Sequence, residues 1–217
     1  MEDFDKKLSN LNKEQIDTDE LTPNDELRSK DKVSKIRMEA FDWLQTLLTA
    51  LLIAVLLFVF VGRMINVSGS SMEGTLLNGD QVIVSNLFYT PRNGDIIIFY
   101  SPHPRFEDPL VKRVIGTPGQ VVDIDFETGN VYIDGVVIYE PYINELTTAR
   151  IDFDGPVTVP EGYVFVLGDN RNRTADSRSN EIGFVDDRYI LGRVLMVLIP
   201  GTERDGTRDW SRIGSPG

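Results

Sequence analysis

The sequence has no cysteine among its 217 residues. This absence excludes disulfide bonds, thiol nucleophiles and thiolate metal sites, and it leaves the redox compartment undetermined. Histidine is nearly as scarce, because His103 is the only one and stands between two prolines. The sequence therefore lacks the several imidazole ligands that a histidine-based metal site needs, and we expect neither a metal nor another cofactor.

Positive charge is also in short supply, since 22 basic residues face 34 acidic ones for a net charge of −12. An acidic exterior opposes binding to phosphate backbones, so we expect no nucleic-acid partner. Residues 169–174, DNRNRT, superficially resemble a calcium loop. Arg171 and Arg173 stand where ligands are needed, however, and Thr174 replaces the glycine of the turn. We therefore expect no metal there.

One long apolar run is present, because residues 43–61, WLQTLLTALLIAVLLFVFV, carry no charge. Roughly 20 helical residues cross a ~30 Å hydrocarbon core, so we predict a transmembrane helix over residues 41–62. A buried helix of a soluble protein is the alternative. A cleavable signal peptide fits poorly, because about 40 residues precede the run and VGR at 61–63 is no small-x-small cleavage site.

The charges that flank this run predict its orientation. Five basic residues lie just before it, whereas only Arg63 lies in the stretch just after it. Residues 1–40 are therefore predicted to be a cytoplasmic tail, largely disordered because its first 30 residues are polar and nearly free of aromatics, with a helical pattern from Lys30 towards the membrane span. We expect a single-pass protein of the cytoplasmic membrane, with the lipid bilayer as a partner and the remainder of the chain outside the cytoplasm.

Residues 63–200 are rich in short β signals. The β-branched runs 81–86, 95–100, 110–116, 163–167 and 193–199 are bounded by turn residues, and Asp134-Gly135 separates two apolar runs, which is typical of a hairpin. No helical patterns alternate with these runs. We therefore predict a mostly β, antiparallel domain, with residues 201–217 after Pro200 as a peripheral tail.

Lysine is the informative basic residue. After Lys35 the chain has one lysine, Lys112, against thirteen arginines from Arg63 onwards. Arginine cannot lose its proton in a protein, whereas a desolvated lysine can. Lowering a lysine pKa from ~10.4 to ~7–8 needs roughly 4 kcal/mol of differential solvation, so other segments would have to cover this side chain. A lysine that snorkels at a sheet edge is the alternative.

Serines cluster in the stretch SGSSMEGTL, residues 68–76, just after the apolar run. Its composition alone does not choose among Ser68, Ser70 and Ser71, and a flexible tether is the plainer interpretation. A serine hydrolase that uses His103 as its base is one further alternative. The polar stretch 168–178, GDNRNRTADSR, offers acid–arginine pairs and hydroxyls that could fix a lysine rotamer.

Four motifs follow one another behind the predicted anchor. They are Ser71-Met72-x-Gly74-Thr75-Leu76, Gly79-Asp80-x-Val82, Lys112-Arg113-x-x-Gly116-x-Pro118-Gly119, and Gly168-Asp169-Asn170-Arg171 with Asp176-Ser177-Arg178. In this order they resemble the type I signal peptidases (leader peptidases), single-anchor branch, over residues from about 41 to 199. The resemblance implies a signal-peptidase-like β-rich fold. It also implies a membrane-anchored serine endopeptidase that removes N-terminal signal peptides from exported precursor proteins.

By that resemblance Ser71 is the nucleophile and Lys112 the general base. Thr174 takes the place of a serine that orients the lysine, Asp176 and Arg178 match a structural ion pair, and Asp169 is expected to pair with Arg113. The resemblance also implies small apolar pockets that would favour Ala-like substrate side chains one and three positions before the cut. The residues of this chain at the pocket-lining positions are Met72, Leu76, Val67, Val82, Ile98 and Val111. An ordinary place in the core is the alternative for each of them.

Three departures from the family pattern stand out. Gly74 replaces the usual proline, which loosens the turn beside Ser71. Gly69 stands where one branch has a serine that aids the oxyanion hole. Two extra residues follow Arg178 before Gly183. These departures keep open a non-catalytic relative, a β-rich binding or assembly factor for surface proteins.

Overall fold

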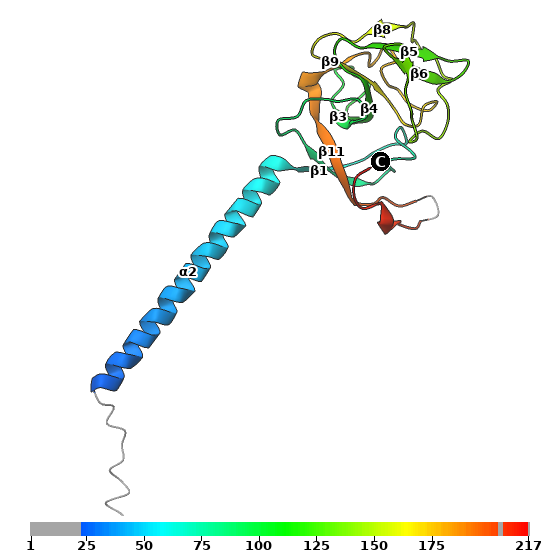
Figure 1. Cartoon of the computed structure of the whole chain (residues 1–217). Helices are drawn as coiled ribbons and strands as arrows, with labels where there is room; N and C mark the ends of the chain where they lie inside the picture. Colours follow the sequence, from blue (N-terminus) through cyan, green and yellow to red (C-terminus); the bar gives the residue numbers. More distant parts are fainter. Residues whose placement is uncertain (1–22, 204–205, 217) are drawn as a thin grey trace, which may run out of the picture. The chain divides into compact units, whose positions relative to one another are not determined.

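The computed structural model describes residues 23–203 and 206–216, and the chain divides into two compact units, Met1–Val55 and Leu56–Gly217. The described part of the first unit belongs to helix α2 (Pro23–Val61), whose last residues belong to the second unit (Figure 1). The helix begins earlier than the predicted start at residue 41. Proline suits the first helical position, because its fixed φ angle is that of a helix. The helical pattern predicted from Lys30 is therefore present, residues 23–29 are helical rather than disordered, and the rest of the predicted tail lies outside the described residues.

Helix α2 is long and apolar enough to cross a membrane over Arg37–Val55. The side chains along this stretch are exposed, including Trp43 at 78% and Leu47 at 64%. Exposed apolar area of this extent is unfavourable in water. The helix is therefore consistent with the predicted membrane anchor.

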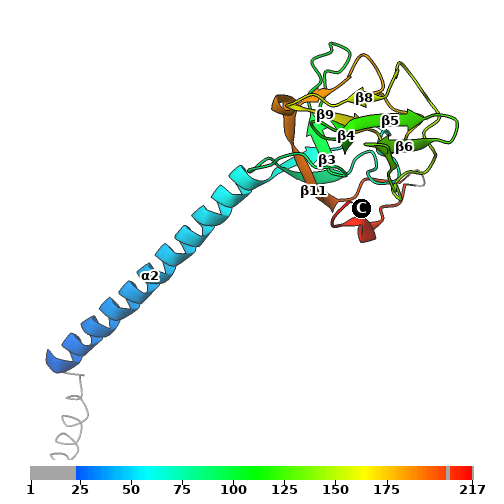
Figure 2. The same ribbon diagram turned by 45° about the horizontal axis from the view of Figure 1, so that its top comes forward.

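The second unit consists of antiparallel strands in two sheets, as predicted (Figure 1; Figure 2). In spatial order the larger sheet holds β1 (Arg63–Asn66), β2 (Gln81–Ser85), β11 (Ile190–Ile199), β3 (Ile96–Phe99), β4 (Leu110–Gly116), β9 (Tyr163–Leu167) and β10 (Val185–Asp186). The smaller sheet holds β7 (Val136–Val137), β6 (Asn130–Ile133), β5 (Val121–Asp125) and β8 (Val157–Thr158). Two short 3-10 helices, η1 (Asp187–Tyr189) and η2 (Trp210–Arg212), complete the described elements.

The β-branched runs of the sequence become these strands. The predicted runs 110–116 and 163–167 coincide with β4 and β9, because both are rich in β-branched and aromatic residues and end at turn residues. Ile133 pairs with Val136, which confirms the two-residue hairpin at Asp134-Gly135. Strand β11 starts at Ile190, three residues before the predicted run.

The larger sheet is buried on both faces around β3. Ile96 and Ile98 enter one buried cluster with Val82, whereas Ile97 and Phe99 enter another. Alternate residues of a strand point to opposite faces, so β3 is covered on both sides. A third cluster fills the space beside the smaller sheet. Strand β4, which carries Lys112, therefore lies next to a fixed and fully packed strand.

The C-terminal segment returns to the second unit instead of leaving it. Gly214 forms a β-bridge with Val197 of β11, and Arg212 forms an ion pair with the fully buried Asp80 at 2.7 Å. Both views show this segment, in red, beside β11 (Figure 1; Figure 2). The stretch that we predicted to be a peripheral tail thus contributes a partner to a buried carboxylate.

Candidate active site

Ser71 lies on a closed loop between β1 and β2, residues 67–80, which we call the nucleophile loop. The loop is closed at its base, where Val67 N–H donates to the Asp80 carbonyl at 2.8 Å and Gly79 N–H donates to the Val67 carbonyl at 2.8 Å. Buried Met72 and Leu76 hold the loop against the first core cluster. The tether interpretation is therefore incomplete, because the stretch has its own hydrogen bonds and its own core residues.

Lys112 projects from β4 to the nucleophile loop. Its side-chain Nζ donates to Ser71 Oγ at 2.8 Å and to the Val111 carbonyl at 2.8 Å. Only 2% of the Lys112 residue is exposed, so the side chain does not snorkel at a sheet edge. Two segments that lie far apart in sequence thus bring a hydroxyl and an amine into direct contact.

Burial lowers the pKa of Lys112 from 10.5 to about 8, because desolvation disfavours the ammonium form. The negative charges of Asp176 and Asp169 act in the opposite direction and raise this pKa. Burial outweighs them. At a mildly alkaline pH a large fraction of Lys112 is therefore neutral and can accept a proton.

Both carboxylates near Lys112 are paired with buried arginines. Asp169 accepts from Arg113 Nε at 2.9 Å and Nη2 at 2.7 Å, and it also accepts from the Thr75 hydroxyl at 2.6 Å. Asp176 accepts from Arg178 Nε at 2.9 Å and Nη2 at 2.9 Å. Two-pronged pairs of this kind fix the position of the carboxylate as well as its charge. The structure therefore contains both pairs that the sequence suggested.

Thr174 lies close to the nucleophile loop, across Gly168. A Cβ atom at Gly168 would lie 2.6 Å from Thr174 Oγ1 and 2.7 Å from the Ser71 carbonyl oxygen. A glycine is therefore needed for these two groups to approach the same backbone. The Thr174 hydroxyl donates to the Ala175 carbonyl at 3.2 Å, whereas the described hydrogen bonds of Lys112 reach Ser71 and Val111. A direct bond from Thr174 to Lys112 stays a prediction.

Asn170 holds the nucleophile loop from the same side, and sequence reasoning assigned it no such role. Its backbone N–H donates to the Ser71 carbonyl at 3.0 Å, and its side-chain amide donates to the Ser70 carbonyl at 3.0 Å. No described hydrogen bond uses the backbone N–H of Ser71 itself. That N–H is thus available to a ligand beside the hydroxyl.

The backbone conformation at position 74 explains why glycine stands where the family pattern has proline. Its φ angle is +111°, which proline cannot adopt. A Cβ atom at Gly74 would lie 2.7 Å from Nδ2 of Asn144, and this Nδ2 donates to the Glu73 carbonyl at 3.2 Å. Asn144 therefore holds the turn from outside, where a proline would have stiffened it from within.

The six residues that match pocket-lining positions are all buried, and all belong to one core cluster: Val67, Met72, Leu76, Val82, Ile98 and Val111. Their exposed fractions range from 0% to 7%. Val67, Met72 and Leu76 belong to the nucleophile loop itself, and Val82, Ile98 and Val111 come from the strands of the same cluster. Their role in binding a substrate stays a prediction.

His103 has its contacts in the loop between β3 and β4. Its Nδ1 accepts from the Arg105 backbone N–H at 3.3 Å, and its ring centroid lies 6.0 Å from that of Phe106. The described contacts of Ser71 do not include it. The nearest described side-chain base to Ser71 Oγ is therefore Lys112.

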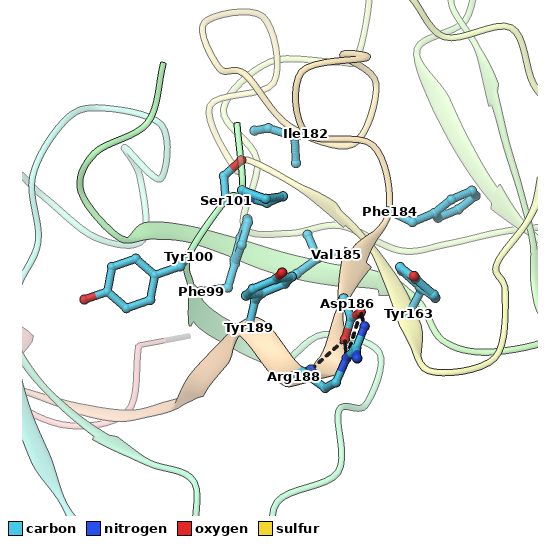
Figure 3. A pocket seen from close by; sticks show the side chains of 11 residues that line it. Phe99, Tyr100, Ser101, Tyr163, Ile182, Phe184, Val185, Asp186, Arg188 and Tyr189 are labelled. Atoms are coloured by element: carbon cyan, nitrogen blue, oxygen red, sulfur yellow. Dashed lines mark hydrogen bonds and ion pairs between the residues drawn. The ribbon is translucent and has the colours of Figure 1, made fainter. Parts of the chain in front are cut away.

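A separate pocket of about 240 Å³ lies where β3, β10 and η1 meet, and Figure 3 shows its aromatic side chains and the Asp186–Arg188 ion pair. Phe99, Tyr100, Tyr163, Phe184 and Tyr189 are among its lining residues. It contains neither Ser71 nor Lys112. It is a surface feature distinct from the candidate active site.

The chain is similar to known proteins of one family. A family described as "Signal peptidase, peptidase S26" matches residues 40–199. Signal peptidase I of Bacillus licheniformis is 33% identical over 81% of this chain and 97% of its own length. Signal peptidase I T of Bacillus subtilis (strain 168) is 33% identical over 88% of this chain and 100% of its own. A crystal structure of a signal peptidase I from Enterococcus faecalis V583 is 37% identical, covers 48% of this chain and 97% of its own, and has a TM-score of 0.40.

Proposed function

The chain belongs to the signal peptidase family, peptidase S26, and we propose that it removes N-terminal signal peptides from exported precursors with Ser71 as nucleophile and Lys112 as general base. Membership of the family makes it a serine endopeptidase. The observation that carries the assignment of the two residues is the 2.8 Å hydrogen bond from Lys112 Nζ to Ser71 Oγ inside a buried site. We propose no metal or other cofactor for this chemistry.

In the first step Lys112 takes the proton of the Ser71 hydroxyl as Oγ bonds to the scissile carbonyl carbon. The carbonyl electron pair moves to oxygen, and the backbone N–H of Ser71 stabilises the resulting oxyanion. The carbon–nitrogen bond then breaks, and the ammonium of Lys112 gives its proton to the leaving amine. Water attacks the acyl-enzyme with Lys112 again as the base, and the proton returns to Ser71 Oγ.

The neighbouring loop residues keep this pair in place. The ion pair Asp169–Arg113 ties the loop of residues 168–178 to β4 beside Lys112, and the pair Asp176–Arg178 lies within that loop. Thr174 is proposed to orient the lysine amine, since its hydroxyl lies against the same Gly168 that faces the Ser71 carbonyl. These contacts position groups whose displacement by a fraction of an ångström slows proton transfer.

The precursor is proposed to bind as an extended strand beside the nucleophile loop. Backbone hydrogen bonds would supply affinity, and small apolar subsites lined by residues such as Met72, Leu76 and Val111 would select Ala-like side chains before the cut. Nucleic acid is not among the proposed partners.

We also propose where the reaction takes place. Helix α2 would anchor the chain once in the cytoplasmic membrane, with its basic N-terminal flank in the cytoplasm and residues 63–217 outside. Ser71 follows Val61 by ten residues, and ten extended residues reach at most ~35 Å. The nucleophile would therefore act close to the outer face of the bilayer, where a membrane-inserted precursor presents its cut site.

The test is cleavage of a purified precursor by the wild type and by the variants Ser71→Ala, Lys112→Ala and His103→Ala. We expect the first two variants to be inactive and the third to cleave at the wild-type rate. Normal cleavage by Ser71→Ala or Lys112→Ala contradicts the proposed dyad. Loss of activity in His103→Ala, with activity kept in Lys112→Ala, would assign the base to His103.

A further inference from the structure

Asp80 is the buried carboxylate at the base of the nucleophile loop, and its exposed fraction is 0%. Its Oδ2 accepts from the Leu77 backbone N–H at 2.8 Å, and its Oδ1 accepts from the Gly201 backbone N–H at 2.6 Å. Taking a carboxylate fully out of water is costly unless a cation and several donors replace the water. Asp80 therefore needs a positive partner.

That partner comes from the C-terminal segment. Arg212 Nη1 donates to Asp80 Oδ1 at 3.0 Å, and its Nη2 donates to Asp80 Oδ2 at 2.7 Å. The same Nη2 also donates to the Thr75 carbonyl at 3.3 Å. Arg212 thus holds the nucleophile loop at two points, one near its base and one four residues after Ser71.

The contacts continue from Thr75 towards the catalytic lysine. The Thr75 hydroxyl donates to Asp169, and Asp169 is paired with Arg113, the neighbour of Lys112 on β4. The Thr75 backbone N–H donates to the Met72 carbonyl at 3.0 Å, which ties it to the residue after Ser71. Arg212 therefore lies at the outer end of a set of hydrogen bonds that reaches Arg113 and Met72, the sequence neighbours of the two members of the proposed dyad.

We infer that Arg212 is a positioning residue for the peptidase reaction: by holding Asp80 and the Thr75 carbonyl it keeps Ser71 Oγ within hydrogen-bond distance of Lys112 Nζ. The inference rests on the proposed Ser71–Lys112 dyad. Arg212 lies outside residues 40–199, the stretch that the family model matches. The C-terminal segment would thereby be a working part of the active site rather than an appendage.

The experiment compares Arg212→Met with the wild type as purified full-length protein in detergent micelles, using a signal-peptide substrate. We expect kcat to fall by about 10- to 100-fold, because a displaced nucleophile is misaligned with its base, while KM stays within about twofold. The pH at half-maximal kcat/KM should move upwards, because a loosened loop admits water to Lys112. Arg208→Met is the matched control, since Arg208 is an exposed arginine of the same segment that stacks on Trp210.

A buried charge without its partner can also prevent folding, so a second variant is needed. Asp80→Asn combined with Arg212→Met leaves no unpaired charge, and it should fold but keep the low kcat and the shifted pH profile. Wild-type kcat and pH profile in either folded variant, with only the melting temperature lowered, would overturn the inference. Ser71→Ala is measured alongside: activity in that variant would refute the dyad itself, whereas an inactive Ser71→Ala with a normal Arg212→Met would refute only the role of Arg212.

Discussion

Replacing Lys112 with methionine is expected to abolish activity and yet to stabilise the folded protein at pH 7. Methionine has a similar length, suits the buried site and carries no charge. Lowering the lysine pKa from 10.5 to about 8 corresponds to ~3 kcal/mol of unfavourable burial of the ammonium group. The variant also loses the hydrogen bonds from Lys112 to Ser71 and Val111. Their loss lowers the free energy of unfolding by roughly 1–2 kcal/mol, which offsets part of this gain. The net gain at pH 7 is therefore on the order of 1–2 kcal/mol.

The sign of this effect depends on pH. Between about pH 8 and 10.5 the lysine is protonated in the unfolded chain and largely neutral in the folded protein. The unfolded state then binds more protons, so the free energy of unfolding of the wild type rises with pH across this window. Below about pH 8 this contribution is absent. The advantage of Lys112→Met should accordingly shrink by ~3 kcal/mol between pH 7 and 11 and should reverse its sign.

The assay is chemical unfolding of the full-length protein in detergent micelles, followed by tryptophan fluorescence at pH 7 and at pH 11. Ser71→Ala serves as the control, because it removes the hydroxyl but keeps the buried lysine. Other groups that titrate in this range affect the wild type and the variant alike, so the difference between them isolates Lys112. An identical difference in unfolding free energy at the two pH values would refute the reasoning.

Three further predictions concern the same site. The wild-type kcat/KM should rise with pH and level off above about 8, and a flat wild-type profile would contradict a lysine base. Lys112→Arg should be inactive at every pH, because arginine keeps its proton. Arg178→Met leaves Asp176 buried without its cation and should lower the free energy of unfolding by about 3–5 kcal/mol, as measured by denaturant titration. Gly168→Ala places a methyl group 2.7 Å from the Ser71 carbonyl oxygen and should reduce kcat by about 10- to 100-fold; wild-type turnover would show that the loop accommodates it.

The strands were predictable wherever the signal is local. The run 110–116 and the Asp134-Gly135 hairpin carry their own β-branched and turn residues, and both appear in the structure. The order of the strands in the sheet was not predictable in this way, because β11 pairs between β2 and β3 although it lies about 100 residues further along the chain. Nothing in the local composition of β11 specifies these two neighbours. The start of helix α2 before Lys30 was missed because charged, helix-compatible residues were interpreted as disordered.

The candidate site divides in the same way. Ser71 and Lys112 were predicted because each lies in a motif, and the ion pairs of Asp169 and Asp176 followed from the same resemblance. Arg212 was missed, because Asp80 stands in the polar turn Asn78-Gly79-Asp80-Gln81, where nothing indicates that its carboxylate is buried and needs a cation. Thirteen arginines follow the apolar run, and local patterns do not say which of them folds back. The sequence also does not distinguish whether Val67 and Ile98 line a substrate pocket or only fill the core, since both places use the same apolar side chains.

The burial of a lone lysine has a practical consequence for chemical labelling. Beyond residue 35 the chain offers a single ε-amine, that of Lys112, and this amine is covered by the nucleophile loop. An amine-selective acylating reagent therefore has one lysine target in the whole β-rich unit, and it reaches that target only when the loop opens. The rate of incorporation, read by mass spectrometry of the peptide that contains Lys112, would report the opening of the active site without any engineered probe.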